Sequence, residues 1–180
     1  VGLDHLPLGL VPVMLAAAFL FRPEAKSVCL IGLGGGSTPL VFRKHLPQVR
    51  LQTVEVDPQV DKLARQYFGF TVQEGQSLTI EDGRQFLKRS AERYDQIWLD
   101  AFNSDYIPAH MATQEFIRLA KSRLASGGII VQNLFCGNRL YDAQIATFQS
   151  VFAKVFVFQG ERSGSCILVA FRIAIRTCRR

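Results

Sequence analysis

The stretch SVCLIGLGGGSTPLVFRKHLPQVRLQTVEVDP, residues 27–58, decides the fold of this chain. Its first segment, Ser27–Ile31, is apolar enough to predict a buried strand, and the glycines after it predict a tight turn into a helix that runs to about Leu46. Leu51–Val56 predicts a second strand that carries Glu55 at its end. Such a βαβ unit binds ligands at the carboxyl ends of its strands. An acidic residue roughly 20 positions after the glycine turn can accept both hydroxyls of a ribose.

The glycine turn favours one class of ligand. It supplies Gly32, Gly34, Gly35 and Gly36, but Ser37 stands where the dinucleotide-binding pattern G-x-G-x-x-G has its last glycine. A phosphate-binding loop is excluded because no Lys-Ser or Lys-Thr pair follows the glycines. The turn therefore predicts a nucleoside without a pyrophosphate, such as S-adenosylmethionine.

The rest of the chain predicts the remainder of an open sheet. Further strands are expected at residues 78–80, 94–99, 129–133, 154–159 and 166–172, and further helices at residues 58–68, 85–90, 113–124 and 141–152. On the helix at 58–68, Val60, Leu63, Ala64 and Tyr67 are expected to face the core. We therefore expect an α/β fold: a Rossmann-like, seven-stranded, mostly parallel sheet with helices on both faces and a C-terminal antiparallel hairpin. Residues 26–180 are expected to form this α/β domain, and residues 1–25 an N-terminal helical segment packed on it.

The apolar segment Leu6–Phe21 is expected to be a buried helix rather than a signal peptide or a membrane span. It contains Pro7 and Pro12, has no basic residues before it, and is shorter than the roughly 20 apolar residues that a span needs.

Composition and charge limit the kinds of partner that the chain is expected to bind. Its 180 residues with 48% hydrophobic content suffice for one domain with its own core. The net charge of +6 permits an acidic partner. However, the Lys and Arg residues are scattered, apart from the cluster of Arg176, Arg179 and Arg180. This distribution favours a solvated surface over a nucleic-acid interface.

The cysteines and histidines do not indicate a metal site. The four cysteines show no C-x-x-C spacing, and the three histidines are too dispersed to share a metal ion, so no metal is expected. Cys29 and Cys166 lie in predicted strands, where we expect free thiols that act as small core residues. A reducing, cytoplasmic location is the resulting expectation.

Further acidic residues follow two other predicted strands. Asp82 and Gly83 come after the strand at 78–80, and Asp100 comes after the strand at 94–99. The loop AFNSDYIPAHM, residues 101–111, leaves the same edge of the sheet and contains Asp105. Loops at this edge commonly carry function. Asp57, in contrast, is expected to cap the helix that follows it.

These motifs resemble the spermidine synthase-like proteins, that is, the polyamine aminopropyltransferases and their relatives, over about residues 8–171. The resemblance rests on the glycine turn, Val54-Glu55-Val56-Asp57-Pro58, Asp82-Gly83-Arg84, Tyr94-Asp95 leading to Asp100, and Leu124 to Gly128. A group of methyltransferase-like proteins with a similar Gly-Leu-Gly-Gly-Gly-Ser turn is nearly as close.

The resemblance implies a transferase of polyamine biosynthesis with the class I methyltransferase-type fold. Its co-substrate would be decarboxylated S-adenosylmethionine or S-adenosylmethionine, and its acceptor a polyamine or another amine. The backbone of the glycine turn would face the sulfonium donor, Glu55 would hold the ribose hydroxyls, and Asp82 with Gly83 would recognise the adenine amine. Asp100 would take the catalytic position, and Asp105 would add negative charge for the polyamine.

Two motifs depart from the family pattern. Members that use decarboxylated S-adenosylmethionine carry an aspartate inside the turn, where this chain has Gly35. Their loop after the fourth strand is Asp-Ser/Thr-Ser/Thr-Asp-Pro, where this chain has Asp100-Ala101-Phe102-Asn103-Ser104-Asp105. The strand-rich N-terminal domain that helps to close the polyamine site in the family is absent from these 180 residues.

Three functions follow as hypotheses. The first is aminopropyl transfer to a polyamine. The second is methyl transfer from intact S-adenosylmethionine, which Gly35 favours because the donor then carries its own carboxylate. The third is a non-catalytic domain that keeps the fold for partner binding or for homodimerisation.

Overall fold

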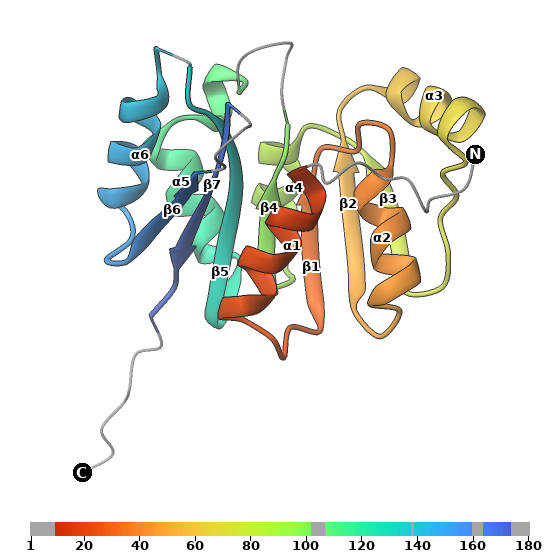
Figure 1. The fold of residues 1–180 in the computed structure, drawn as a ribbon, viewed down its shortest axis with the longest axis horizontal. Coiled ribbons are helices and arrows are strands. Elements are labelled where there is room, and N and C mark those ends of the chain that lie inside the picture. Colours follow the sequence, from red (N-terminus) through yellow and green to blue (C-terminus); the bar gives the residue numbers. More distant parts are fainter. Residues whose placement is uncertain (1–9, 102–106, 138, 160–163, 174–180) are drawn as a thin grey trace.

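The computed structural model describes residues 10–101, 107–137, 139–159 and 164–173, and within these it describes no side chains for residues 10–12. The described residues form one seven-stranded sheet of order β3-β2-β1-β4-β5-β7-β6 (Figure 1). The strands are β1 (Ser27–Ile31), β2 (Arg50–Glu55), β3 (Gln76–Ile80), β4 (Tyr94–Leu99), β5 (Leu124–Phe135), β6 (Val155–Gln159) and β7 (Ser165–Phe171). The helices are α1 (Leu10–Phe21), α2 (Ser37–His45), α3 (Pro58–Phe68), α4 (Gly83–Arg89), the 3-10 helix η2 (Ala109–Met111), α5 (Gln114–Ser122) and α6 (Tyr141–Gln149).

The sheet topology confirms the predicted fold class. Strands β3, β2, β1, β4 and β5 are parallel neighbours, whereas β7 is antiparallel to both β5 and β6. The strand order reverses direction at β1, because β2 lies on one side of it and β4 on the other. Ligands of open α/β sheets bind outside the carboxyl ends of the strands at this reversal point.

Helices cover both faces of the sheet. On one face, Met14, Ala18 and Phe42 from α1 and α2 pack with Trp98 and other side chains of the sheet. On the other face, side chains of α4, α5 and α6 such as Phe116 pack against the alternate strand residues. Successive strand residues point to opposite faces, so the almost continuously apolar strands β1, β4 and β7 are buried on both sides.

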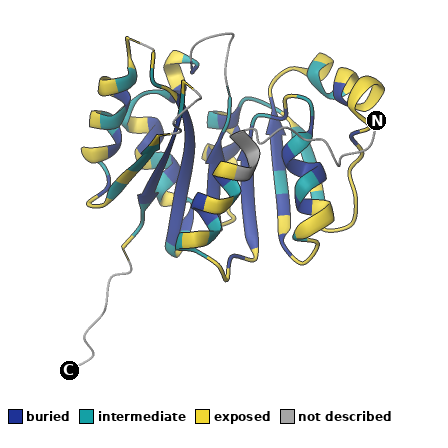
Figure 2. Cartoon of the chain, in the orientation of Figure 1, coloured by how far each residue is buried: buried dark blue, intermediate teal, exposed yellow. Residues whose placement is uncertain are grey.

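The expected inward face of α3 is wrong in part. Within this fully described helix Ala64 is buried, whereas Leu63 is 48% and Tyr67 is 67% exposed. Figure 2 shows α3 mostly in the colour of exposed residues. The physical reason is its place: α3 packs through Val60 and Ala64 on a small cluster with Phe70, at the edge of the sheet, and not on a broad sheet face.

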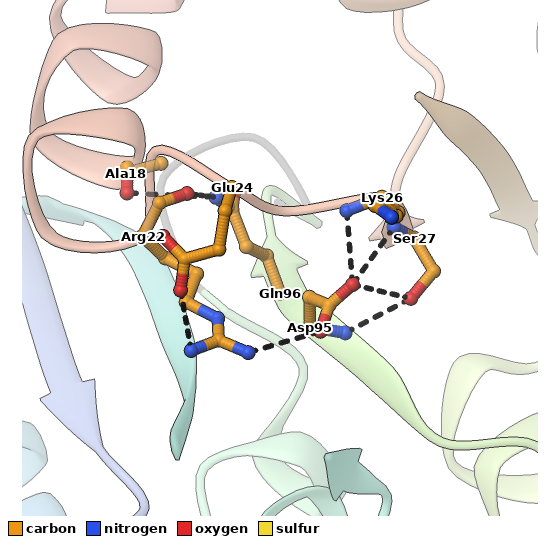
Figure 3. Close-up of polar contacts among 7 residues, drawn as sticks. All are labelled: Ala18, Arg22, Glu24, Lys26, Ser27, Asp95 and Gln96. Carbon is orange, nitrogen blue, oxygen red and sulfur yellow. Dashed lines mark hydrogen bonds and ion pairs between the residues drawn. The ribbon is translucent and has the colours of Figure 1, made fainter. Parts of the chain in front are cut away.

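Polar contacts fix the C-terminal end of α1 to the edge of the sheet opposite the predicted site (Figure 3). One carboxylate oxygen of Asp95 accepts hydrogen bonds from Lys26 N, Ser27 N and Ser27 Oγ at 2.9–3.1 Å. Arg22 Nη2 lies 3.4 Å from the other oxygen. Gln96 Nε2 donates to the carbonyl oxygen of Arg22 at 3.2 Å. The predicted helix in Leu6–Phe21 is thus observed from Leu10, and it is tied to β1 and β4.

Strand β5 is longer than expected. It begins at Leu124 rather than at Ile129, and its pairing with β4 shifts register between Tyr94 and Gln96. Gly127, with φ of 71°, provides this irregularity, because side chains disfavour positive φ. The Gly127-Gly128 pair therefore lies at a register irregularity within the strand.

A disulfide corrects the expectation for Cys166. Cys136, just after β5, is bonded to Cys166 on β7, with the two Cα atoms 6.2 Å apart. The pairing of Leu134 with Cys166 across the two strands brings these cysteines together although they are 30 residues apart in the chain. Cys29 is a buried free thiol, as predicted, and burial raises its pKa. The cysteines therefore no longer support a reducing location, and the cytoplasmic location stays a prediction.

Among the helices of the described residues, none is long and apolar enough to cross a membrane.

Candidate functional site

A cavity of about 460 Å³ opens at the carboxyl ends of β1, β2 and β4. Strands β1 and β4 are held together at this end by a hydrogen bond from Asp100 N to the Ile31 carbonyl oxygen, at 2.9 Å. Of the predicted site residues, the structure brings six to the cavity wall: Gly32, Gly34, Glu55, Asp82, Gly83 and Asp100. Residues up to 68 positions apart in the chain thus line one space next to the reversal point of the sheet.

Gly32 allows the strand ends to approach this closely. It has φ of 106°, and a Cβ atom at this position would lie 2.3 Å from the carbonyl oxygen of Asp100. Any side chain at residue 32 would force β1 and β4 apart where the cavity begins. Gly34, with φ of 53°, has no atom within 4 Å of its Cβ position, so its backbone is open to a ligand.

Gly35 and Gly36 do not line this cavity. A Cβ atom on Gly35 would lie 3.4 Å from the ring of Phe68, and one on Gly36 would lie 2.9 Å from Phe70. These two glycines therefore let the turn pack against the end of α3 and the residues after it.

Glu55 joins the glycine turn to the end of β2. The residue is 8% exposed, and its Oε2 accepts a hydrogen bond from Leu33 N at 2.9 Å. Its Oε1 accepts one from Asp57 N at 3.0 Å. Each carboxylate oxygen has a second lone pair, so both can still accept a hydroxyl from the cavity. Asp57 itself caps α3 by accepting from Gln59 N, as predicted.

Asp82 caps α4 and contacts His110, which was expected in the loop at this edge of the sheet but not as a site residue. Its Oδ1 accepts a hydrogen bond from Gln85 N at 2.9 Å, and its Oδ2 lies 2.7 Å from His110 Nε2. Partial burial would raise the pKa of Asp82, but these hydrogen bonds hold it below its ordinary value. His110 lines the cavity from η2, and Arg84 Nη1 donates to its carbonyl oxygen at 2.7 Å. Because 28 residues separate His110 from Asp82, no local pattern could reveal the contact.

Asp100 lies at the end of β4 beside Asn133 of β5. Asn133 Nδ2 donates a hydrogen bond to Asp100 Oδ1 at 3.2 Å. Burial raises the pKa of Asp100 to about 6, although this hydrogen bond opposes the shift. A carboxylate with a raised pKa in a cavity is a candidate general base, because it accepts a proton more readily than an exposed one. Asn133, near the end of β5, was not predicted as a site residue, because no sequence motif marks it.

Asp105, the second predicted catalytic residue, lies outside the described residues. Among the described residues, no group of three or more His, Cys, Asp or Glu side chains could hold a metal ion.

The fold and cavity define the class: a Rossmann-like methyltransferase-type domain with a candidate ligand cavity at the reversal point of its sheet. More narrowly, the chain belongs to the spermine/spermidine synthase family, whose domain model matches residues 9–167.

Comparison with individual proteins gives relatives of two kinds. A polyamine aminopropyltransferase of Vibrio vulnificus is 37% identical over 161 residues, which cover 87% of this chain and 54% of that protein. Human methyltransferase-like protein 13, solved in complex with SAH, superposes with a TM-score of 0.76 at 26% identity and covers 93% of this chain and 80% of its own. A probable spermidine synthase from Corynebacterium glutamicum superposes with a TM-score of 0.76 at 24% identity, over 89% of this chain and 62% of its own, and so supports the fold. The chain spans about half the length of the Vibrio protein.

Proposed function

We propose that this chain transfers an aminopropyl group from decarboxylated S-adenosylmethionine to a polyamine amine. One observation carries the proposal: Asp100, with its raised pKa, lines a cavity together with the turn glycines and Glu55. Family membership and the Vibrio aminopropyltransferase support it. The acceptor is a small amine. Nucleic-acid binding is not part of the proposal, and a homodimer, a cytoplasmic location and the division into residues 1–25 and 26–180 remain predictions.

The cavity offers a group for each part of the donor. The free lone pairs of Glu55 would accept the ribose hydroxyls, and Asp82 with Gly83 would meet the adenine amine. Val56 and Val60 line the same wall and would contact the base. Gly34 would let the donor approach the backbone of the turn. The sulfonium group would then lie toward Asp100, at the other end of the cavity.

The chemistry requires a neutral amine aligned behind the reacting carbon. The lone pair of the amine nitrogen forms the new N–C bond while the C–S bond breaks. The electron pair of the C–S bond stays on sulfur, which leaves methylthioadenosine. Asp100 accepts the proton that the nitrogen releases. The enzyme's contribution is thus alignment of the amine plus general-base catalysis.

Methyl transfer from intact S-adenosylmethionine is the second candidate, and Gly35 favours it. Gly35 has no carboxylate that could pair with the ammonium of an aminopropyl group. The nearest group to its Cβ position is the apolar ring of Phe68. The likeness to methyltransferase-like protein 13 supports the same candidate.

Calorimetric titration tests the proposal. We expect the purified chain to bind decarboxylated S-adenosylmethionine more tightly than the intact form, and to release methylthioadenosine when 1,4-diaminobutane is added. Preference for the intact form, with methylated product from an amine, would replace the first candidate by the second. Absence of binding to both donors and to methylthioadenosine would leave the non-catalytic hypothesis.

Glu55→Gln tests the donor site separately. An amide nitrogen would face Leu33 N or Asp57 N, and the charge that accepts the ribose hydroxyls would be lost. We expect methylthioadenosine binding to weaken by about 1–3 kcal/mol. Glu74→Gln, an exposed acid in the loop before β3, is the matched control and should bind as the wild type does. Equal affinity in both variants would remove Glu55 from the donor site.

A further inference from the structure

Asn133 has a geometry that the proposed roles of Asp100 and Glu55 do not use. It is 8% exposed at the end of β5, and its Nδ2 donates to Asp100 Oδ1 at 3.2 Å. Leu99 pairs with Gln132 across β4 and β5, so the next residues, Asp100 and Asn133, are neighbours, and of the two Asp100 lines the cavity. A carboxylate only accepts hydrogen bonds, which fixes the nitrogen of the amide toward Asp100 and its oxygen away from it.

The side-chain oxygen of Asn133 is buried and has no hydrogen-bond partner among the described residues. A buried oxygen without a hydrogen-bond partner costs free energy unless a ligand or a water molecule donates a hydrogen bond to it. Gln132 Oε1 is also buried and unpaired, but neighbouring strand residues point to opposite faces, so Gln132 faces away from Asp100. Gln144 Nε2 on α6 is unpaired as well. Neither Gln144 nor Asn133 lines the cavity itself, but Asn133 contacts Asp100, which does. Among these, Asn133 combines an unpaired oxygen with direct contact to the proposed base.

We infer that Asn133 positions both the base and the acceptor: its Nδ2 holds Asp100, and its Oδ1 accepts an N–H from the attacking amine. This inference rests on the proposed function. A neutral primary amine has two N–H groups and one lone pair. With one N–H directed to Asp100 and the other to Asn133, the lone pair points at the carbon bound to sulfur. A secondary amine or a hydroxyl has one hydrogen to offer and leaves one of the two acceptors unpaired. The site therefore selects primary amines.

The experiment compares Asn133→Ala with the wild type and with Gln144→Ala, which also removes a buried carboxamide with an unpaired atom. Calorimetry measures the affinity of 1,4-diaminobutane and of its N,N,N′,N′-tetramethyl derivative for each protein saturated with methylthioadenosine. Near neutral pH both bind as ammonium ions, and the tetramethyl ion keeps only one N–H on each nitrogen. We expect Asn133→Ala to bind the primary diamine about tenfold more weakly and the tetramethyl derivative with little change. Binding of methylthioadenosine itself should be unchanged, and Gln144→Ala should behave as the wild type does.

A second readout does not need turnover. Carbon-13 NMR of labelled aspartate carboxyl groups, with the Asp100 signal identified by its loss in Asp100→Asn, gives the pKa of Asp100 in each protein. Loss of the hydrogen bond in Asn133→Ala should move this pKa upward, and Gln144→Ala should leave it in place.

The outcomes separate the inference from the proposed function. Amine binding that depends on Asn133, without release of methylthioadenosine from a donor, would keep the inference and overturn aminopropyl transfer. Equal diamine affinity and an unmoved Asp100 pKa in Asn133→Ala would overturn the inference, whatever the turnover. So would loss of methylthioadenosine binding to the same extent as the diamine, because Asn133 would then be structural. A wild type that binds no amine overturns it as well.

Discussion

Asp100, the proposed base, connects the proposed chemistry to stability at the scale of a single residue. Its folded pKa of about 6 lies above the ordinary value for aspartate, mainly because of burial. A raised carboxyl pKa stabilises the fold below the unfolded pKa, and this contribution is lost as the pH rises through the folded value. At pH 7 the ionised group therefore costs stability.

Asp100→Asn should separate the two effects. We expect turnover to be abolished and methylthioadenosine binding to be retained. Stability at pH 7 should equal or exceed that of the wild type, because no buried charge remains. For the wild type, kcat/KM should fall as the pH drops below about 6, where the base becomes protonated. Denaturant unfolding and a pH–rate profile check both points, and full turnover by the variant would exclude Asp100 as the base.

Gly35 carries a prediction about donor preference. Its φ is not positive and its Cβ position has room up to the Phe68 ring at 3.4 Å, so the backbone accepts a side chain. Gly35→Asp would supply the carboxylate that family members carry in the turn. We expect the ratio of affinities, decarboxylated over intact donor, to rise about tenfold.

Gly35→Ala is the control for this substitution, because it adds the Cβ atom without the charge. A ratio that changes equally in both variants would show that shape, and not charge, determines the donor preference.

At the scale of elements, the Asp95 contacts hold α1 to the sheet. Partial burial would raise the pKa of Asp95, but hydrogen bonds from Lys26, Ser27 and Arg22 outweigh it and keep the pKa below its ordinary value. A lowered carboxyl pKa stabilises the fold above the unfolded pKa, and this stability is lost as the pH falls through the folded value.

We expect Asp95→Ala to lower the free energy of unfolding by about 2–3 kcal/mol at pH 7. The difference from the wild type should narrow below about pH 4, where the carboxylate becomes protonated. Glu92→Ala removes an exposed acid whose contact with Arg50 is long, 3.5 Å, and should change stability by less than about 0.5 kcal/mol. Urea unfolding at both pH values measures these effects. A difference that persists at low pH would mean that packing, and not charge, accounts for the loss.

The disulfide acts at the scale of the whole molecule, because it joins the end of β5 to β7 across 30 residues. Closing a loop of this length restricts the unfolded chain. The double variant Cys136→Ser, Cys166→Ser should therefore lose about 3 kcal/mol of unfolding free energy under oxidising conditions.

With reductant present, the wild type should lose stability toward the level of the double variant. Thiol titration of the unfolded, unreduced protein provides the independent check. Four reactive thiols, together with equal unfolding midpoints, would show that the bond does not form in solution.

The sequence by itself determined the sheet and six residues of the cavity wall. The pattern of Ser27–Pro58 sets a parallel βαβ unit, and parallel strands bring their carboxyl ends to one edge. Glu55, Asp82 and Asp100 could therefore be assigned to that edge from their places after strands. Helix caps such as Asp57 were predictable because a cap forms its hydrogen bond within a few residues of itself.

The tertiary structure alone decided the contacts between segments that are distant in the chain. His110 beside Asp82, Asn133 beside Asp100 and Cys136 bonded to Cys166 all depend on which strands and loops become neighbours. The exposure of Leu63 and Tyr67 has the same origin, because helical spacing gives an apolar face but not the surface that it meets. Local sequence patterns determine which helix or strand each segment can form. The burial, the pKa and the contact partners of a side chain are set only when the sheet assembles and brings distant segments together.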